Sequence, residues 1–291
     1  MEKEVKLVKK LKRLLRHIGC PRWLHHFGPK KYEAYQHILV LLLMQICPSL
    51  SLRRACKLLN NLGFSVPTYS AVCKLRQRLP FQIWEKILKV SAGVEHEKVA
   101  IDSTGFSRTH PSYHYIKRIC RRKAIKRYAK LSALFDIKSK KFIALRIRNK
   151  ARHDSKDAKY LLKKATLKRL YGDTAYDAEW LHEYCFGRKI QTFIKPRKNV
   201  KRGFYRKKQM KKYSEKEYHQ RSLMESGFGS LKRKHGGFVS GKNIKSMKTE
   251  IYCKAIAHNL SLRKRFSTEP AISKPLKIDG IINAMNLGKA S

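Results

Sequence analysis

Two kinds of hydrophobic spacing divide the chain. Up to about residue 97, apolar residues recur three or four positions apart, which predicts amphipathic helices. We expect helices at roughly 5–18, 31–47, 52–59 and 67–78. From residue 98 onward, shorter runs alternate apolar and polar residues, which predicts β-strands. The pattern therefore predicts an all-helical N-terminal region, residues 1–97, followed by a domain built on a sheet.

The second region predicts an α/β fold. Its expected elements are strands at 98–103, 127–137 and 142–148, a helix at 154–165, a strand at 168–172, a helix at 178–186, a strand at 190–194, and helices at 214–234 and 244–265. The first three strands form a meander, and the later strands each follow a helix. This order predicts a mixed sheet with antiparallel and parallel neighbours and flanking helices. We assign residues 98–265 to this domain and 266–291 to a C-terminal tail.

The helical hairpin at 52–78 resembles a helix-turn-helix. Asn60 to Gly63 form the expected turn, and the second helix is basic, with Arg76 and Arg78 near its end. In a helix-turn-helix the second helix lies in a DNA groove, so Arg76 and Arg78 are candidate DNA contacts. Many helical hairpins that only pack within a protein share this pattern. Both interpretations remain open.

The charge balance favours nucleic acid as a partner. Lys and Arg number 68 against 20 Asp and Glu, which gives a formal charge of +48. Such a field repels itself unless a polyanion neutralises it. The most apolar stretch, residues 38–47, is too short to cross a bilayer, and the N-terminus lacks the features of a signal peptide. Seven scattered cysteines without a CxxC pair favour a reducing, cytoplasmic environment over disulfides or zinc.

Two aspartates stand where predicted strands end. Asp102 closes the apolar run that begins at Val99, and Asp173 follows Gly172 at the end of the 168–172 strand. Small residues follow both aspartates, and α/β folds place their sites at the carboxyl ends of strands. Taken singly, Asp173 is also a turn residue and Asp102 also a cap of the next segment. Taken together in so basic a chain, they predict a metal site for phosphodiester chemistry.

A third acid lies on a stripe of the long helix at 214–234. At 100° per residue, four side chains fall within an arc of about 60°: Tyr218, Arg221, Glu225 and Lys232. A carboxylate between cations can hold a metal while its neighbours bind phosphate oxygens. A solvated face with an Arg221–Glu225 pair explains the spacing too. Gly227 and Gly229 weaken the helix, and close approach of a nucleic-acid backbone would explain them.

Two basic segments predict a non-specific DNA channel. Residues 184–214 contain twelve Lys or Arg and no acid, and we expect part of this segment to be a mobile loop that orders on DNA. Its candidate contacts are Lys195, Arg197 and Lys198. The segment 117–130 adds Arg121 and Arg122. Contacts of this kind supply affinity and leave sequence choice to other residues.

These residues carry a resemblance to a family. The chain resembles the insertion-sequence transposases that have a ribonuclease-H-like DDE domain. More narrowly, residues 218–232 match the signature Tyr-x2-Arg-x3-Glu-x6-Lys of one subgroup at every fixed position. The segments around Asp102 and Asp173 resemble the family's first and second aspartate strands, and residues 152–155 resemble a segment often seen between them. About 50 residues separate Asp173 from Glu225, which leaves little room for the β-rich insertion of some relatives.

The resemblance implies both a fold and an activity. Asp102, Asp173 and Glu225 would hold two Mg²⁺ ions, with Mn²⁺ as a substitute, for in-line displacement at phosphorus. The enzyme would bind the element's terminal inverted repeats, nick them and join the freed 3′-hydroxyl to target DNA, as a homodimer in the synaptic complex. Asp154, Asp177 and Glu179 are spare acids. Two alternatives stay open: a nuclease of this fold without strand transfer, and a non-catalytic DNA-binding relative.

Overall fold

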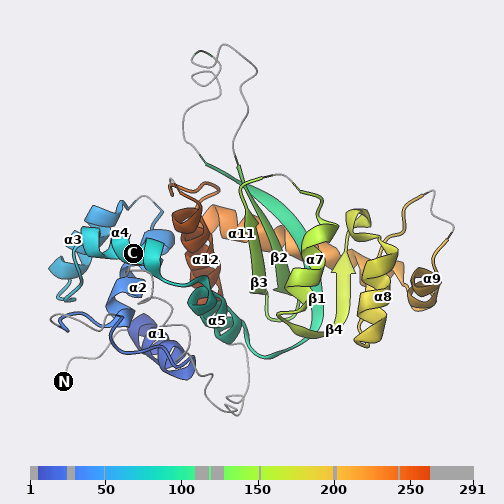
Figure 1. Ribbon diagram of the computed structural model, residues 1–291, viewed down its shortest axis with the longest axis horizontal. Coiled ribbons are helices and arrows are strands. Elements are labelled where there is room, and N and C mark those ends of the chain that lie inside the picture. Colours follow the sequence, from blue (N-terminus) through green and yellow to red (C-terminus); the bar gives the residue numbers. More distant parts are fainter. Residues whose placement is uncertain are drawn as a thin grey trace, which may run out of the picture. The chain divides into compact units, whose positions relative to one another are not determined.

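The chain forms two compact units (Figure 1). The computed structural model describes residues 6–24, 30–48, 50–108, 118, 128–150, 152–198, 202–241 and 243–262. One unit combines Met1–Ser91 with Lys248–Ser291, and the other spans Ala92–Met247. None of the helices in these described ranges has both the length and the apolar character needed to cross a membrane.

The first unit is helical, as expected. Its helices are α1 (Lys6–His17), α2 (Ala34–Ile46), α3 (Leu52–Asn61), α4 (Tyr69–Arg78), α5 (Phe81–Ala92) and most of α12 (Ile244–Ser261). Two begin at side-chain caps: Ser51 accepts a hydrogen bond from the backbone of Arg54, and Thr68 accepts one from Ala71. The sequence pattern had predicted four of these helices at the N-terminal side and had not separated α5.

Helix α12 groups with the N-terminal helices, whereas the sequence placed it in the second domain. The Tyr252 hydroxyl donates to Glu85 and the Asn259 amide donates to Ser91, both on α5. Side chains all around α12 are buried, polar ones such as Lys254 included. An apolar period reveals a buried face, but it does not reveal which part of the chain covers that face.

The second unit contains a five-stranded mixed sheet in the order β3-β2-β1-β4-β5. The strands are β1 (Glu95–Ser107), β2 (Tyr128–Asp136), β3 (Lys141–Arg148), β4 (Thr166–Gly172) and β5 (Gln191–Ile194). Strands β1, β2 and β3 form the expected antiparallel meander, and β4 and β5 run parallel to β1. The predicted ribonuclease-H-like sheet is therefore confirmed. Strand β1 is longer than expected at both ends.

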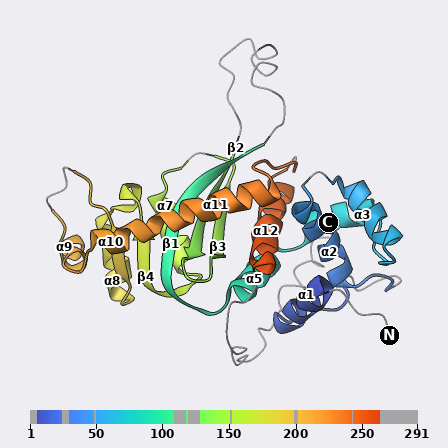
Figure 2. The same ribbon diagram turned by 180° about the vertical axis from the view of Figure 1, so that it is seen from behind.

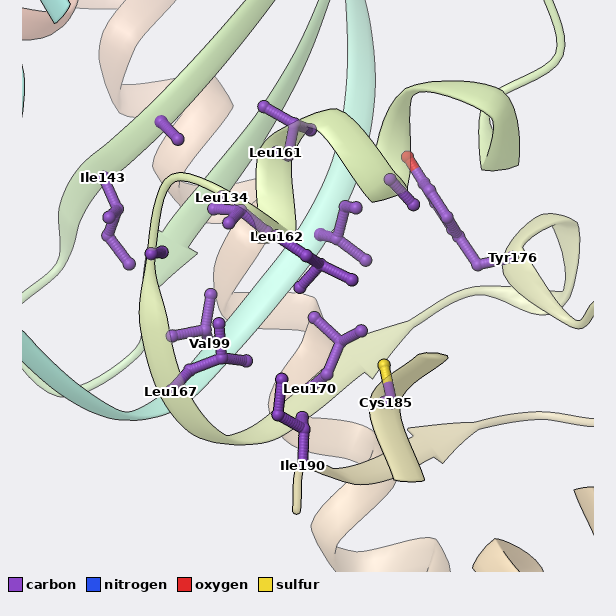
Figure 3. Close-up of a cluster of buried hydrophobic side chains, with 14 of the residues drawn as sticks. Val99, Leu134, Ile143, Leu161, Leu162, Leu167, Leu170, Tyr176, Cys185 and Ile190 are labelled. Atoms are coloured by element: carbon purple, nitrogen blue, oxygen red, sulfur yellow. The ribbon is translucent and has the colours of Figure 1, made fainter. Parts of the chain in front are cut away.

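Helices α7 (Ser155–Leu162) and α8 (Glu179–Gly187) cover one face of this sheet (Figure 1). Figure 3 shows the core between these helices and the sheet, where Val99 of β1 and Leu170 of β4 meet Leu161 and Leu162 of α7. Because side chains alternate along a strand, the residues between these core positions point to the opposite face. Asp102 and Asp173 belong to that opposite face.

The opposite face is crossed by a long helical segment (Figure 2). We call residues 215–235 the motif helix; it consists of α10 (Glu215–Tyr218), the 3₁₀ turn η2 (His219–Arg221) and α11 (Ser222–His235). Gly227 lies where an added Cβ would come within 2.7 Å of the Phe135 ring. Close approach to the sheet therefore explains Gly227, and our expectation of a nucleic-acid backbone at that position was wrong. Gly229 has nothing within 4 Å of such a Cβ.

The basic segment after β5 contains a docked helix, α9 (Phe204–Met210), where we expected a mobile loop. Arg206 donates a 2.6 Å hydrogen bond to the buried carboxylate of Asp177. Gln209 accepts a 3.1 Å hydrogen bond from the backbone of Thr192 on β5. The segment has no acid of its own, and the acids that anchor it come from the turn before α8. Its composition alone therefore suggested more freedom than the described part has.

Candidate active site

Asp102 and Asp173 occupy matching positions on neighbouring parallel strands. Ala100 of β1 pairs with Tyr171 of β4, and each aspartate lies two residues farther along the chain. Asp173 directly follows β4, as predicted, whereas Asp102 lies inside β1, which continues to Ser107, so our prediction of a strand end at Asp102 was wrong. Adjacent strands are about 4.8 Å apart, so the two carboxylates stand side by side on one face. Two acids that are 71 residues apart in sequence are thus neighbours (173 − 102 = 71).

The environment of Asp102 favours the neutral form of its carboxyl group over the charged form. Burial raises its pKa to about 6, with repulsion from Asp173 and Asp154 adding to the effect. A 2.7 Å hydrogen bond from the backbone of Ser103 and the positive charge of Arg221 act in the opposite direction. Ionised carboxylates held together in this way are stabilised when a cation binds between them.

Asp173 also caps the turn that follows it. Its carboxylate accepts a 3.0 Å hydrogen bond from the backbone of Ala175 at the start of the 3₁₀ turn η1 (Thr174–Tyr176). The preceding residue, Gly172, packs closely, since a Cβ added there would come within 3.2 Å of the Ile101 side chain. The turn role that we left open is therefore real, and it fixes the position of Asp173 at the strand end.

A series of hydrogen-bonded polar side chains supports β1 next to Asp102. The Ser103 hydroxyl lies 2.9 Å from the hydroxyl of Ser132, which donates to the carboxylate of Asp157. Asp157 is buried on α7 and pairs with Arg148 of β3 at 2.6 Å. Sequence analysis missed Asp157 and Ser132, because a hydrogen-bonded pair on separate elements leaves no local pattern.

Arg221 lies between the acid of its own helix and the two acids of the sheet. Its guanidinium donates a 2.8 Å hydrogen bond to Glu225. Burial works against its charge, yet Tyr218, Glu225 and the two aspartates together raise its pKa. Arg221 thus neutralises the acids in this conformation, and the Arg221–Glu225 pair that we had weighed as an alternative is present.

Lys232 continues the same stripe farther along α11. Its ammonium group donates a 2.6 Å hydrogen bond to the Thr104 hydroxyl and lies 5.6 Å from the centre of the Phe106 ring. Thr104 lies two residues beyond Asp102 on the same face of β1. Burial lowers the pKa of Lys232. The Lys232 end of the predicted stripe therefore lies against β1, the strand that carries Asp102.

The three acids do not form one metal-binding group in this conformation. The described residues contain no set of three Asp, Glu, His or Cys side chains placed to hold one ion. The structure brings Asp102 and Asp173 together, while the Glu225 side chain is 59% exposed and pairs with Arg221. Oxygen donors of this kind suit Mg²⁺ or Mn²⁺.

The structure places two of the predicted DNA contacts beside the aspartates. Ile194 of β5 pairs with Gly172, so Lys195 follows next to Asp173. The side chain of Arg197 donates to the carbonyl of Thr174 at 3.3 Å, in the turn that Asp173 caps. Lys198 is exposed. Arg121 and Arg122 lie outside the described residues.

The two arginines of α4 differ in exposure. Arg78 is exposed. The Nε atom of Arg76 is buried, and the positive charge of Arg76 acts on the thiol of Cys253 of α12. The position of Arg78 therefore suits a DNA contact, and that of Arg76 suits packing within the helical unit.

The spare acids have other partners. Asp177 and Glu179 anchor α9 through Arg206 and the backbone of Tyr205. Asp154 pairs with Lys130 of β2. The contacts of Asp177 and Glu179 give these two acids structural roles. Asp154 lies near enough to Asp102 for its negative charge to raise the pKa of Asp102.

A family model described as a transposase DDE domain matches residues 94–260, which is more than half of the chain. The chain belongs to the transposase DDE-domain family. The matched residues begin just before β1 and include the two aspartates and the motif helix of this transposase. The resemblance found from its signature residues is thereby confirmed.

Solved structures similar to this transposase include other transposases. A synaptic complex of the piggyBac transposase with hairpin DNA has 11% identity and a TM-score of 0.43, and the match covers 98% of this chain and 77% of that one. A pre-cleavage Mos1 transpososome has 13% identity and a TM-score of 0.26, with 92% and 91% covered. A Mos1 paired-end complex with the left transposon end has 12% identity, a TM-score of 0.25 and 89% of each chain covered. No curated protein matches the chain.

Proposed function

We propose that this transposase cleaves DNA at the ends of an insertion sequence and joins the freed 3′-hydroxyl to target DNA. The observation that carries the proposal is the placement of Asp102 and Asp173, each two residues beyond the Ala100–Tyr171 pair of parallel strands, on the face that the motif helix crosses. Half-buried like charges at this position are costly for stability, and a site that binds a divalent cation explains why they are kept.

Asp102, Asp173 and Glu225 are the proposed ligands. A bound Mg²⁺ or Mn²⁺ would activate the attacking oxygen and stabilise the leaving oxygen at phosphorus. The two aspartates are already adjacent, and Glu225 becomes available when Arg221 turns toward a DNA phosphate instead. Phosphate is the natural competitor for this arginine, because its forked donors bind phosphate oxygens as well as carboxylates.

Other residues of this chain bind and orient the DNA. Arg221 and Lys232 lie on the site face and would hold the phosphates on either side of the cut, with Tyr218 as a further donor. Lys195 and Arg197 follow β5 beside Asp173 and would extend this contact along the backbone. Phosphate contacts set the register of DNA without reading its sequence.

Recognition of the terminal repeats is assigned to the helical unit. The α3–α4 hairpin presents the exposed Arg78, and the charge of +48 favours a long DNA footprint. The resemblance implies a homodimer on paired ends. The mass of the complex with two end fragments, measured by light scattering, distinguishes one copy from two.

The test is cleavage of DNA that carries the element's ends, with Mg²⁺ and with a chelator. Asp102→Asn, Asp173→Asn and Glu225→Gln should each lower the rate by at least about 1,000-fold and leave DNA affinity within a few fold. Glu183→Gln, an exposed change on α8, is the matched control and should cleave normally. Wild-type rates in any of the three variants would remove that residue from the site.

A second assay separates the proposal from its rivals. Pre-cut ends with 3′-hydroxyl groups should become joined to a target plasmid. Cleavage without joined products would identify a nuclease, and Mg²⁺-independent binding without cleavage would identify a non-catalytic DNA-binding protein.

A further inference from the structure

We infer that Glu217 is a positioning residue, whose carboxylate fixes the motif helix against β1, which carries Asp102, and β4, which Asp173 follows. The inference rests on the proposed function. It assigns a task to an acid that belongs to neither the metal-ligand set nor the signature stripe.

One carboxylate joins three elements of the sheet unit. The Tyr171 hydroxyl of β4 donates a 2.5 Å hydrogen bond to Oε2 of Glu217. The ammonium group of Lys98, on β1, donates to Oε1 at 3.2 Å. Arg169 of β4 adds a longer contact of 3.5 Å to Oε2. Lys98 and Arg169 are partners in the sheet register, so Glu217 spans the junction between β1 and β4.

Gln220 reinforces the junction from the next turn of the motif helix. Its amide donates a 3.0 Å hydrogen bond to Oε1 of Glu217 and its carbonyl accepts a 3.3 Å hydrogen bond from Lys98. Lys98, Glu217 and Gln220 thereby form a closed ring of contacts. A closed ring restrains the helix in rotation as well as in distance, because no member can turn without breaking two contacts.

The anchor lies on the same surfaces as the site. Lys98 precedes Asp102 by four residues and Tyr171 precedes Asp173 by two, so each pair shares one face of its strand. On the motif helix, Glu217 precedes Arg221 by four residues, which is about one turn. A shift of the helix at Glu217 is therefore passed directly to Arg221 and the aspartates.

The anchor is stiff because Tyr171 is fixed. Its side chain is fully buried, and its ring stacks on Phe193 of β5 with centres 5.1 Å apart. A charge-assisted hydrogen bond from such a donor is short and directional. Acids are scarce in this chain, yet three donors from the sheet converge on this one. Solubility does not require that arrangement, whereas precise placement of the helix does.

The experiment compares Glu217→Gln with Glu215→Gln. Both changes remove one charge from α10, but Glu215 is exposed and its ion pair with Lys195 is long, at 3.9 Å. Tyr171→Phe is the second variant, because it keeps the packed ring and removes only the donor. Hydrogen exchange of residues 215–225 is measured without metal and DNA, and cleavage is measured across a Mg²⁺ titration.

Glu217→Gln should exchange faster over 215–225, cleave about 10- to 100-fold more slowly and need more Mg²⁺ for half-maximal rate, with DNA affinity unchanged. Tyr171→Phe should change in the same direction by less, and Glu215→Gln should match the wild type. Unchanged exchange and metal dependence in both anchor variants would overturn the inference. If the wild type shows no Mg²⁺-dependent cleavage, the proposed function fails, and the exchange measurement still decides whether Glu217 anchors the helix.

Discussion

Arg221 holds Glu225, the acid of its own helix, through a 2.8 Å hydrogen bond, while it also faces the two aspartates of the sheet. An internal cation therefore occupies the electrostatic role that the proposed function gives to a metal ion. Under the proposed function, a divalent cation would compete with Arg221 for the carboxylates, and a DNA phosphate would compete with Glu225 for the guanidinium.

Removing this internal cation should strengthen metal binding and weaken catalysis. Arg221→Ala should bind Mn²⁺ about tenfold more tightly without DNA, because one competing positive charge is gone. Its cleavage rate should fall by about 100-fold, because a phosphate donor is lost. Titration followed by electron paramagnetic resonance measures the affinity. Arg233→Ala, an exposed change on the same helix, is the control, and weaker Mn²⁺ binding by Arg221→Ala would contradict the exchange model.

Asp102→Asn should stabilise the metal-free protein at neutral pH. The folded-state pKa of Asp102 is raised from 3.8 to about 6, so the folded protein holds this proton more tightly than the unfolded chain does. The wild type therefore loses stability as pH rises from about 4 to about 6. The variant lacks this loss and should be more stable by about 1–2 kcal/mol at pH 7, after allowance for solvent screening.

Urea denaturation with a chelator at pH 4 and pH 7 measures that effect. The two proteins should have similar free energies of unfolding at pH 4 and should differ at pH 7. A constant difference across the range would mean that ionisation of Asp102 is not the cause.

Gly227 and Gly229 should respond oppositely to alanine. A Cβ at Gly227 meets the Phe135 ring, so Gly227→Ala should destabilise the fold by about 1–3 kcal/mol. Gly229 has open space, so Gly229→Ala should add up to about 1 kcal/mol through helix propensity. Thermal unfolding of the two variants measures the pair, and equal effects would mean that the close approach of α11 to Phe135 is not limiting.

Asp177→Asn should release α9 and remove stability in a pH-dependent way. Burial raises the pKa of Asp177, but hydrogen bonds from His182, Arg197 and Arg206 outweigh it and lower the pKa to about 2. The stability from this carboxylate is present above about pH 4 and is lost as pH falls toward 2. The variant should lose about 2 kcal/mol at pH 7 and much less at pH 2.5. Denaturant titration at both values checks this, with Glu183→Gln as the neutral control.

Arg78 and Arg76 should differ in DNA binding. Arg78 is exposed on α4, so Arg78→Ala should weaken binding and reduce the slope of log affinity against log salt by about one. Arg76 is turned into the helical unit, so Arg76→Ala should leave the slope unchanged and lower the melting temperature. A reduced slope for Arg76→Ala would return that residue to the DNA interface.

The sequence by itself determined the order of most elements, the strand end before Asp173, and the stripe that contains Arg221 and Glu225. Each of these depends on spacing within one segment, and the backbone geometry of helices and strands converts such spacing directly into a face or an end. The family resemblance depends on the same short-range patterns, which is why it could be identified before the fold was known.

Tertiary structure alone decided which segments meet. It placed Asp102 beside Asp173, Gly227 against Phe135, and Asp177 under α9. It also paired Tyr171 with Glu217 across 46 positions of sequence. Such contacts depend on strand register and on which face each helix covers, and these are set by the packing of the whole unit. A residue's local pattern is the same whether its partner is a metal, a phosphate or another side chain, so its role follows from the neighbour that the fold provides.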